Sequence, residues 1–183
     1  MAHKEQQDFC NYVQEKFPNH FIGSYVLDIG SLDINGNNRY LFHNSKYIGI
    51  DVSEGRNVDA VCMGHRYTIG ENMEYEKFDT IISTECFEHD KYWALTIQNV
   101  CNNLLRDSGL FLFTCATTGR PEHGTRRSDT GSSPLTSNIE NWDNYYLNLT
   151  EMDIRQAVDI DAIFDTYEFI VNGFDLYFWG IKK

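Results

Sequence analysis

The feature that most constrains the fold is the alternation of short apolar segments with amphipathic ones. Apolar runs of strand length occur at 24–29, 46–52, 58–62, 78–83 and 110–115. Apolar residues at helical spacing occupy 4–17, 37–43 and 91–105, between or before these runs. Because strands that alternate with helices pair in parallel, the pattern predicts an α/β fold with helices on both faces of a parallel sheet.

The last third of the chain departs from this pattern. Residues 116–144 are rich in Thr, Gly, Ser, Pro and Arg and have little periodicity, which indicates a long functional loop. A helix over 150–158 follows, with Thr150 as its cap. Two aromatic-rich strands, 164–171 and 174–181, then flank Asn172-Gly173, a strong hairpin signal. We expect one domain over 1–183, with an N-terminal helical region at 1–20 and a substrate-side loop insertion at 116–149.

Charge and composition narrow the function classes. The net charge of −12 lacks the basic footprint of nucleic-acid binding, so a small molecule or a protein is favoured as substrate. No apolar run approaches the length of a membrane span, and the polar N-terminus lacks a signal-peptide core, which predicts a cytoplasmic protein. The five cysteines contain no CxxC pair, so a disulfide framework or a structural zinc site is not expected.

Polar residues gather after each predicted strand, where ligands bind in open α/β sheets. In the first of these loops, Gly30 and Gly36 allow backbone to approach a ligand, and Asp28, Asp33 and Asn35 supply acceptor groups. The loop lacks the GxGxxG pattern of a dinucleotide site, and its two aspartates would repel a pyrophosphate. They suit a ligand with a cationic group, although a tight turn capped by these side chains is the alternative.

Asp51 ends the second predicted strand, about 20 residues after the glycine loop, where an acid can hold a ribose diol. The loop and the acid together favour a nucleoside cofactor without a phosphate bridge. S-adenosylmethionine has this chemistry.

Four segments carry a resemblance to a known family: "VLDIGSLDING", "YIGIDV", "FDTIISTECFEHD" and "LLRDSGLFLFTCAT", all within 25–118. With these segments the chain resembles the class I S-adenosylmethionine-dependent methyltransferases of the type 11 group. The resemblance implies a Rossmann-like, doubly wound, mostly parallel seven-stranded sheet with a C-terminal antiparallel hairpin strand. It also implies S-adenosylmethionine as cofactor and S-adenosylhomocysteine as product.

The resemblance also implies a set of cofactor contacts. Asp28 and Gly30 would lie near the methionine part, Asp51 would hold the ribose hydroxyls, and Glu85 would face the methionine end or the substrate. Met63 and Gly64 stand where relatives have an Asp-Ala pair, so backbone N–H groups and Met63 packing would contact adenine instead. Asp33 and Asn35 would either touch the cofactor or shape the loop. The predicted cofactor-binding residues are Asp28, Gly30, Ser31, Asp33, Asn35, Asp51, Val52, Met63, Gly64, Ser83 and Glu85.

Catalytic candidates lie in two segments. Glu88 and His89 follow the fourth strand and are either structural or, for His89, a general base. His123, in the loop after the fifth strand, is the other candidate base. The predicted substrate-binding residues are Arg120, Glu122, Arg126 and Tyr146, because arginines hold carboxylates or phosphates and an aromatic side chain can form a pocket wall.

A metal site made from Glu88, His89, Glu122 and His123 is a further possibility, but no HxxxH-type spacing supports it, and no metal site is predicted. The predicted reaction is methyl transfer to an oxygen or nitrogen of a small-molecule or glycan-type acceptor by direct displacement. The alternatives are a protein or RNA methyltransferase and a non-catalytic S-adenosylmethionine-binding protein.

Overall fold

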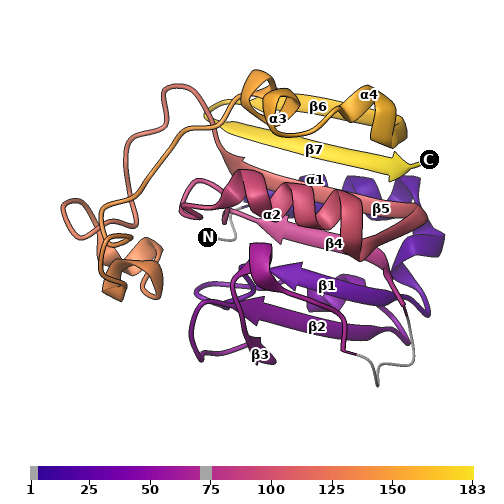
Figure 1. Cartoon of the computed structure of the whole chain (residues 1–183), viewed down its shortest axis with the longest axis horizontal. Coiled ribbons are helices and arrows are strands. Elements are labelled where there is room, and N and C mark those ends of the chain that lie inside the picture. Colours follow the sequence, from indigo (N-terminus) through magenta and orange to yellow (C-terminus); the bar gives the residue numbers. More distant parts are fainter. Residues whose placement is uncertain (1–3, 71–75) are drawn as a thin grey trace.

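The computed structural model of the chain describes residues 4–70 and 76–183 and is built on a seven-stranded sheet (Figure 1). The strand order is β3-β2-β1-β4-β5-β7-β6. β1 to β5 pair in parallel, and β7 is antiparallel to both β5 and β6. The strands are β1 (Tyr25–Ile29), β2 (Lys46–Asp51), β3 (Ala60–Val61), β4 (Phe78–Thr84), β5 (Leu105–Ala116), β6 (Phe164–Asn172) and β7 (Asp175–Lys182). The predicted fold class is confirmed.

Four α-helices accompany the sheet in the described residues: α1 (Lys4–Lys16), α2 (Trp93–Asn99), α3 (Glu151–Ala157) and α4 (Ile160–Ile163). A π-helical turn, Val100–Leu104, continues α2. Residues 1–3 of the expected helical region 1–20 lie outside the described residues. No described helix has the length and apolar character needed to cross a membrane.

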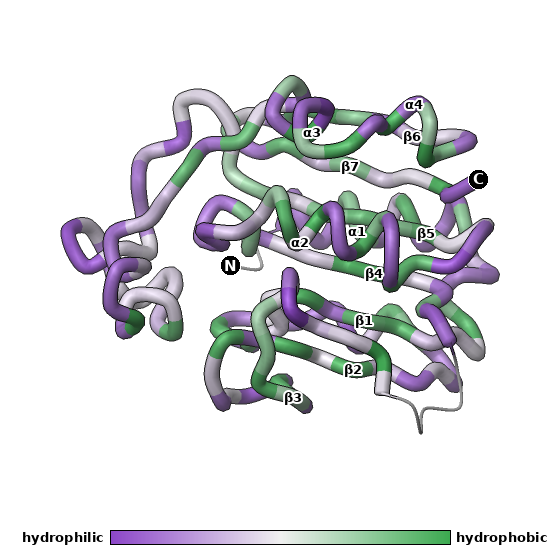
Figure 2. Tube along the Cα trace, viewed as in Figure 1, coloured by the Kyte–Doolittle hydropathy of each residue, from purple (hydrophilic) through white to green (hydrophobic). Residues whose placement is uncertain are grey.

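Helices pack on both faces of the sheet, and each face has its own apolar core. Phe9, Cys10 and Val13 of α1 pack with Val26, Ile82, Leu110, Leu112, Tyr177 and Trp179 on one face. On the other face, Ile97 and Val100 of the α2 segment and Ile154 of α3 pack with Leu27, Ile81, Phe111, Phe113 and Phe178. Neighbouring strand residues alternate between the two cores, so the central strands are hydrophobic along most of their length (Figure 2).

The topology places the ligand-binding edge. The chain runs outward from β1 to β2 and β3, then returns to the other side of β1 to form β4 and β5. This reversal between β1 and β4 is a topological switch point, where open α/β sheets bind ligands outside the carboxyl ends of their strands. The segment between β5 and α3 extends from the same edge, at the left of Figure 1.

Local structure differs from the sequence expectations in a few places. Only a 3₁₀ turn, Arg39–Leu41, forms where a helix was expected over 37–43. β5 begins at Leu105, which pairs with Phe78 before the register shifts, so the expected turn at 107–109 is a bulge inside the strand. Its Ser108 has a φ of +59°. The predicted cap is confirmed, because Thr150 and Asp153 form a reciprocal capping box at the start of α3.

Candidate functional site

A cavity opens at the carboxyl ends of β1, β2 and β4. Its walls come from the loops that follow these strands and from the 116–149 loop. Most of the predicted cofactor-binding residues line it: Asp28, Gly30, Ser31, Asn35, Asp51, Val52, Met63, Gly64 and Glu85. The other two predicted residues, Asp33 and Ser83, are not among the described residues that line it.

Asp28 is the penultimate residue of β1, and its carboxyl group is buried. The Tyr47 hydroxyl donates a hydrogen bond of 2.5 Å to its Oδ2, while Oδ1 has no hydrogen-bond partner among the described residues. Burial raises the pKa of this carboxyl to about 7, although the Tyr47 hydrogen bond acts in the opposite direction. A cationic or hydrogen-bond-donating group in the cavity would satisfy the remaining oxygen.

Asp51 ends β2 and connects two loops. Its Oδ2 accepts a hydrogen bond from the Leu32 N–H (3.0 Å), and its Oδ1 accepts one from the Val52 N–H (2.7 Å). Each carboxylate oxygen has a second lone pair, so the group can still accept hydrogen bonds from a ligand. Burial raises its pKa. The carboxylate is therefore held in a fixed position at the cavity wall.

The two predicted residues outside the cavity lining hold the loops in place. Asp33 accepts hydrogen bonds from the Gly36 N–H (2.8 Å) and the Asn37 side chain (2.8 Å), and it forms an ion pair with Arg56 (2.7 Å). Ser83 donates a hydrogen bond to the Ile29 carbonyl (2.8 Å), which joins β4 to β1. The pair of acids that faces a ligand is consequently Asp28 and Asp51, and not Asp28 and Asp33.

Glycine is required at position 30, where the loop after β1 passes close to the loop after β4. Its φ is +77°, and a Cβ built on it would lie 2.4 Å from the Sγ of Cys86. Glu85, on the adjoining loop, also has a positive φ of +51° although it is not glycine. Such strained backbone is held in place by the surrounding structure, here by the Glu85 N–H donating to the Thr114 carbonyl (2.9 Å).

The 116–149 loop supplies one side of the cavity, through residues other than those predicted from the sequence. Its lining residues are Ser132, Ser133, Pro134, Leu135, Thr136 and Trp142. The loop is fixed against the segment after β4, because the Trp142 indole donates to the His89 carbonyl (2.5 Å) and the Leu147 N–H donates to the Glu88 carbonyl (3.0 Å). An apolar residue such as Trp142 in a loop without periodicity was the only sequence signal for this docking.

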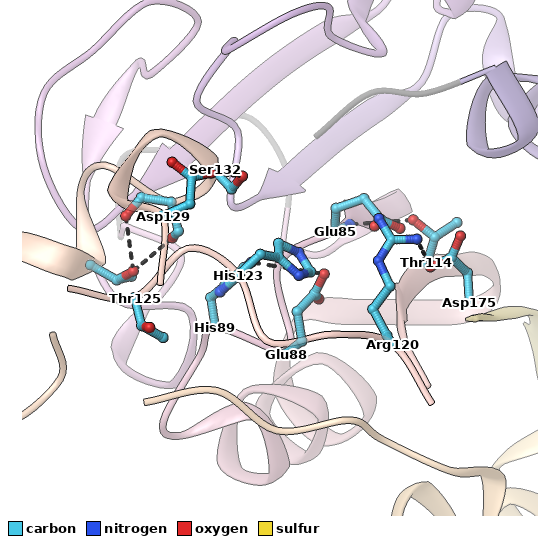
Figure 3. A network of polar contacts seen from close by, with 12 residues as sticks. Glu85, Glu88, His89, Thr114, Arg120, His123, Thr125, Asp129, Ser132 and Asp175 are labelled. Carbon is cyan, nitrogen blue, oxygen red and sulfur yellow. Dashed lines mark hydrogen bonds and ion pairs between the residues drawn. The ribbon is translucent and has the colours of Figure 1, made fainter. Parts of the chain in front are cut away.

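The two candidate bases lie beside each other. The His89 ring lines the cavity, and its centroid is 5.0 Å from that of His123 in an edge-to-face arrangement. Tyr146 packs against both rings, 5.6 Å from His89 and 5.0 Å from His123. Burial, followed by the neighbouring His123, lowers the pKa of His89 to about 3, so this imidazole is neutral near neutral pH. Figure 3 shows these rings above the carboxyl group of Glu88.

The charged residues predicted to bind substrate are engaged elsewhere. Arg120 pairs with Asp175 (3.2 Å), as Figure 3 shows, and Arg126 pairs with Asp143 (3.3 Å). Glu122 accepts hydrogen bonds from Arg127 and from the Thr125 hydroxyl, both at 2.6 Å. None of Arg120, Glu122, Arg126 and Tyr146 is among the described residues that line the cavity.

Solved structures share this fold. A methyltransferase that depends on S-adenosylmethionine, from Clostridium acetobutylicum, is 13% identical with a TM-score of 0.61, over 97% of this chain and 92% of that one. The 1,6-didemethyltoxoflavin-N1-methyltransferase of Burkholderia thailandensis was solved with bound 1,6-didemethyltoxoflavin and S-adenosylhomocysteine. It is 12% identical with a TM-score of 0.58, over 100% of this chain and 92% of that one.

A third structure is the Haemonchus contortus phosphoethanolamine N-methyltransferase 2, solved in complex with S-adenosyl-L-methionine. It is 15% identical with a TM-score of 0.61, over 96% of this chain and 52% of that one. No family model and no curated protein matches the sequence. The chain therefore has the fold of the class I S-adenosylmethionine-dependent methyltransferases.

Proposed function

We propose that this protein is an S-adenosylmethionine-dependent methyltransferase, with 1–183 as one catalytic domain and with its four sequence motifs assigning it to the type 11 group. The proposal rests on the cavity at the switch point of the sheet, which has the buried carboxyl group of Asp28 and the half-buried carboxyl group of Asp51 in its wall. The fold supports it, because the neighbours from Burkholderia and Haemonchus are solved with S-adenosylhomocysteine and S-adenosyl-L-methionine.

The residues present fit this cofactor. The unpartnered Oδ1 of Asp28 is an acceptor for the ammonium group of the methionine part, and Asp51 is the acceptor for the ribose hydroxyls. Met63 and the backbone of Gly64 are the proposed contacts of the adenine. Two carboxylates without a GxGxxG turn disfavour a dinucleotide, whose pyrophosphate would meet like charge.

When bound, the cofactor would supply an activated methyl group to an acceptor oxygen or nitrogen, and its sulfur would keep the electron pair of the broken bond. The protein's part is to place the acceptor in the space between the cofactor pocket and the 116–149 loop and to exclude water there. A hydroxyl acceptor also has to lose a proton. Of the two candidate bases, we assign its removal to His123, which packs against the cavity-lining His89, because a pKa of about 3 makes His89 a weak base.

We propose a small-molecule or glycan-type acceptor. The net charge of −12 and the engagement of Arg120 and Arg126 in ion pairs leave little positive charge for a nucleic-acid backbone. The cavity is closed on one side by the 116–149 loop, as a small acceptor requires.

Calorimetric titration with S-adenosylmethionine and S-adenosylhomocysteine tests the proposal. Asp51→Asn should weaken binding by about tenfold or more, because a hydrogen bond to a charged group is lost. Asp107→Asn, at an exposed position in the β5 bulge, is the matched control and should bind like the wild type.

Equal affinity of Asp51→Asn and wild type for the cofactor would refute the placement. Incubation with hydroxyl and amine acceptors should then release S-adenosylhomocysteine. A protein that binds the cofactor tightly but releases no product with any acceptor, protein and RNA included, would be a non-catalytic binder.

A further inference from the structure

Glu88, His89 and His123 bring three potential metal ligands together beside the cavity. One ligand atom from each residue lies within 4.8 Å of the others. Glu88 and His89 come from the segment after β4, and His123 comes from the 116–149 loop, so the chain assembles the group from two distant segments. In Figure 3 the Glu88 carboxyl group points toward the imidazole rings.

Glu88 is the unusual member of this cluster. Its side chain is completely buried, and neither carboxylate oxygen has a hydrogen-bond partner among the described residues. Its Oε1 lies 4.0 Å from His89 Nε2, which is too far for a hydrogen bond. His89 Nδ1 is also buried and has no partner among the described residues. Buried carboxylates are normally paired or bound to a metal, so the Glu88 carboxyl group is available to a ligand.

We propose that Glu88, His89 and His123 form a binding site for a divalent transition-metal ion of the Zn²⁺ type. Two imidazoles and one carboxylate match the ligands of catalytic zinc and related sites, whereas Mg²⁺ and Ca²⁺ prefer oxygen ligands alone.

The geometry requires only a small closure. With bonds of about 2.0–2.2 Å, ligand atoms around a tetrahedral metal lie roughly 3.4 Å apart. The separations of up to 4.8 Å therefore have to contract by about 1.4 Å at most. His123 lies half-buried on a loop, so it can make this movement, while Glu88 and His89 are fixed in the core. Glu122 is not a ligand, because Arg127 and Thr125 already engage its carboxylate.

Three protein ligands leave a coordination position open, as in catalytic metal sites. His89 lines the cavity, so that position adjoins the proposed acceptor space. The Tyr146 hydroxyl is buried, has no partner in the part of the chain that the structure describes, and is the candidate to hold a water or an acceptor oxygen there.

A metal ion bound here would lower the pKa of an acceptor hydroxyl, a consequence that rests on the proposed function. In the metal-loaded protein, His89 and His123 are then ligands and not bases, because their lone pairs are occupied.

Metal binding is measured without cofactor or acceptor, so its outcome is separate from that of the methyltransferase proposal. Zn²⁺ titration by calorimetry should give one ion per chain, and Co²⁺ should develop visible d–d absorption. Glu88→Gln and His123→Ala should each weaken Zn²⁺ binding at least ~10-fold. Glu15→Gln and His43→Ala are the matched controls, because both residues are exposed and lie away from the site.

His123→Ala changes a half-buried loop residue and should fold like the wild type, which thermal unfolding verifies. Glu88→Gln removes a buried unpaired acid and should not destabilise the metal-free protein, which separates a ligand role from a structural one. Wild-type affinity in both variants, or less than one ion bound per wild-type chain, would overturn the site.

Discussion

Replacing Asp28 by Asn should change how stability depends on pH. The ordinary pKa of an aspartate, 3.8, rises to about 7 at this position because the carboxyl group is buried. At about 1.4 kcal/mol per pKa unit, the ionised form costs the folded state about 4 kcal/mol. Asn cannot ionise, and its side-chain oxygen can still accept the hydrogen bond from Tyr47.

The sign follows from proton binding. Between the unfolded and the folded pKa, the folded protein holds a proton that the unfolded chain has lost, so stability falls as pH rises through this window. Integration between about pH 5 and about pH 8 gives a loss of roughly 2.5 kcal/mol for Asp28. Between about pH 5 and about pH 8, the free energy of unfolding of the wild type should fall by this amount relative to that of Asp28→Asn. Asp28→Asn should therefore be the more stable protein at the higher pH.

The assay is urea unfolding of both proteins, without cofactor, across this pH range. Asp33→Asn is the matched control, since hydrogen bonds from Asn37, Arg56 and Gly36 hold the Asp33 pKa below its ordinary value. Its stabilisation is lost only as pH falls below this range, so its difference from wild type should stay constant between about pH 5 and pH 8. If the profiles of wild type and Asp28→Asn run parallel, the Asp28 carboxylate is not destabilised by burial.

Three further outcomes are expected. If Asp28 binds the cofactor's ammonium group, affinity for S-adenosylmethionine should fall up to about tenfold per pH unit below about pH 7, as Asp28 takes up a proton; calorimetry showing a flat profile would contradict this. Thr150→Ala should lose about 1 kcal/mol in urea unfolding, because it removes the capping box; an unchanged midpoint would count against the cap. Gly124→Ala should destabilise by more than ~1 kcal/mol, because φ is +67° and the new Cβ would lie 2.5 Å from the His89 ring. Gly173→Ala shares a φ of +63° but has open space around its Cβ, so equal losses in the two glycine variants would argue against the clash.

The sheet was predictable because each strand is an apolar run between turn residues, and the hairpin carries its own local signal. The elements that were missed depend on contacts distant in sequence. β5 starts early because Leu105 can pair with Phe78 across the bulge at Ser108. The short α4 lasts a single turn, which is too brief for periodicity to show.

The residues of the site also divide into those that the sequence could place and those that depend on contacts distant in sequence. Asp28 and Asp51 could be placed because parallel strands bring their carboxyl ends to one edge. For Asp33 the sequence left open whether it touches the cofactor or shapes the loop, since one of its partners, Arg56, lies 23 residues away. The meeting of Glu88 with His123 depends on how the 116–149 loop folds back, which no local spacing encodes.

The 116–149 loop has a narrow neck. The Leu149 N–H donates to the Ala116 carbonyl (2.9 Å), and the Asn148 side chain donates to the Arg120 carbonyl (2.9 Å). The ends of the loop are therefore joined where it leaves the sheet, and the entropic cost of closing it grows only slowly with its length. Because the ends are joined independently of the interior, we expect changes in the length or sequence of the interior to reshape this wall of the cavity while the sheet keeps its structure.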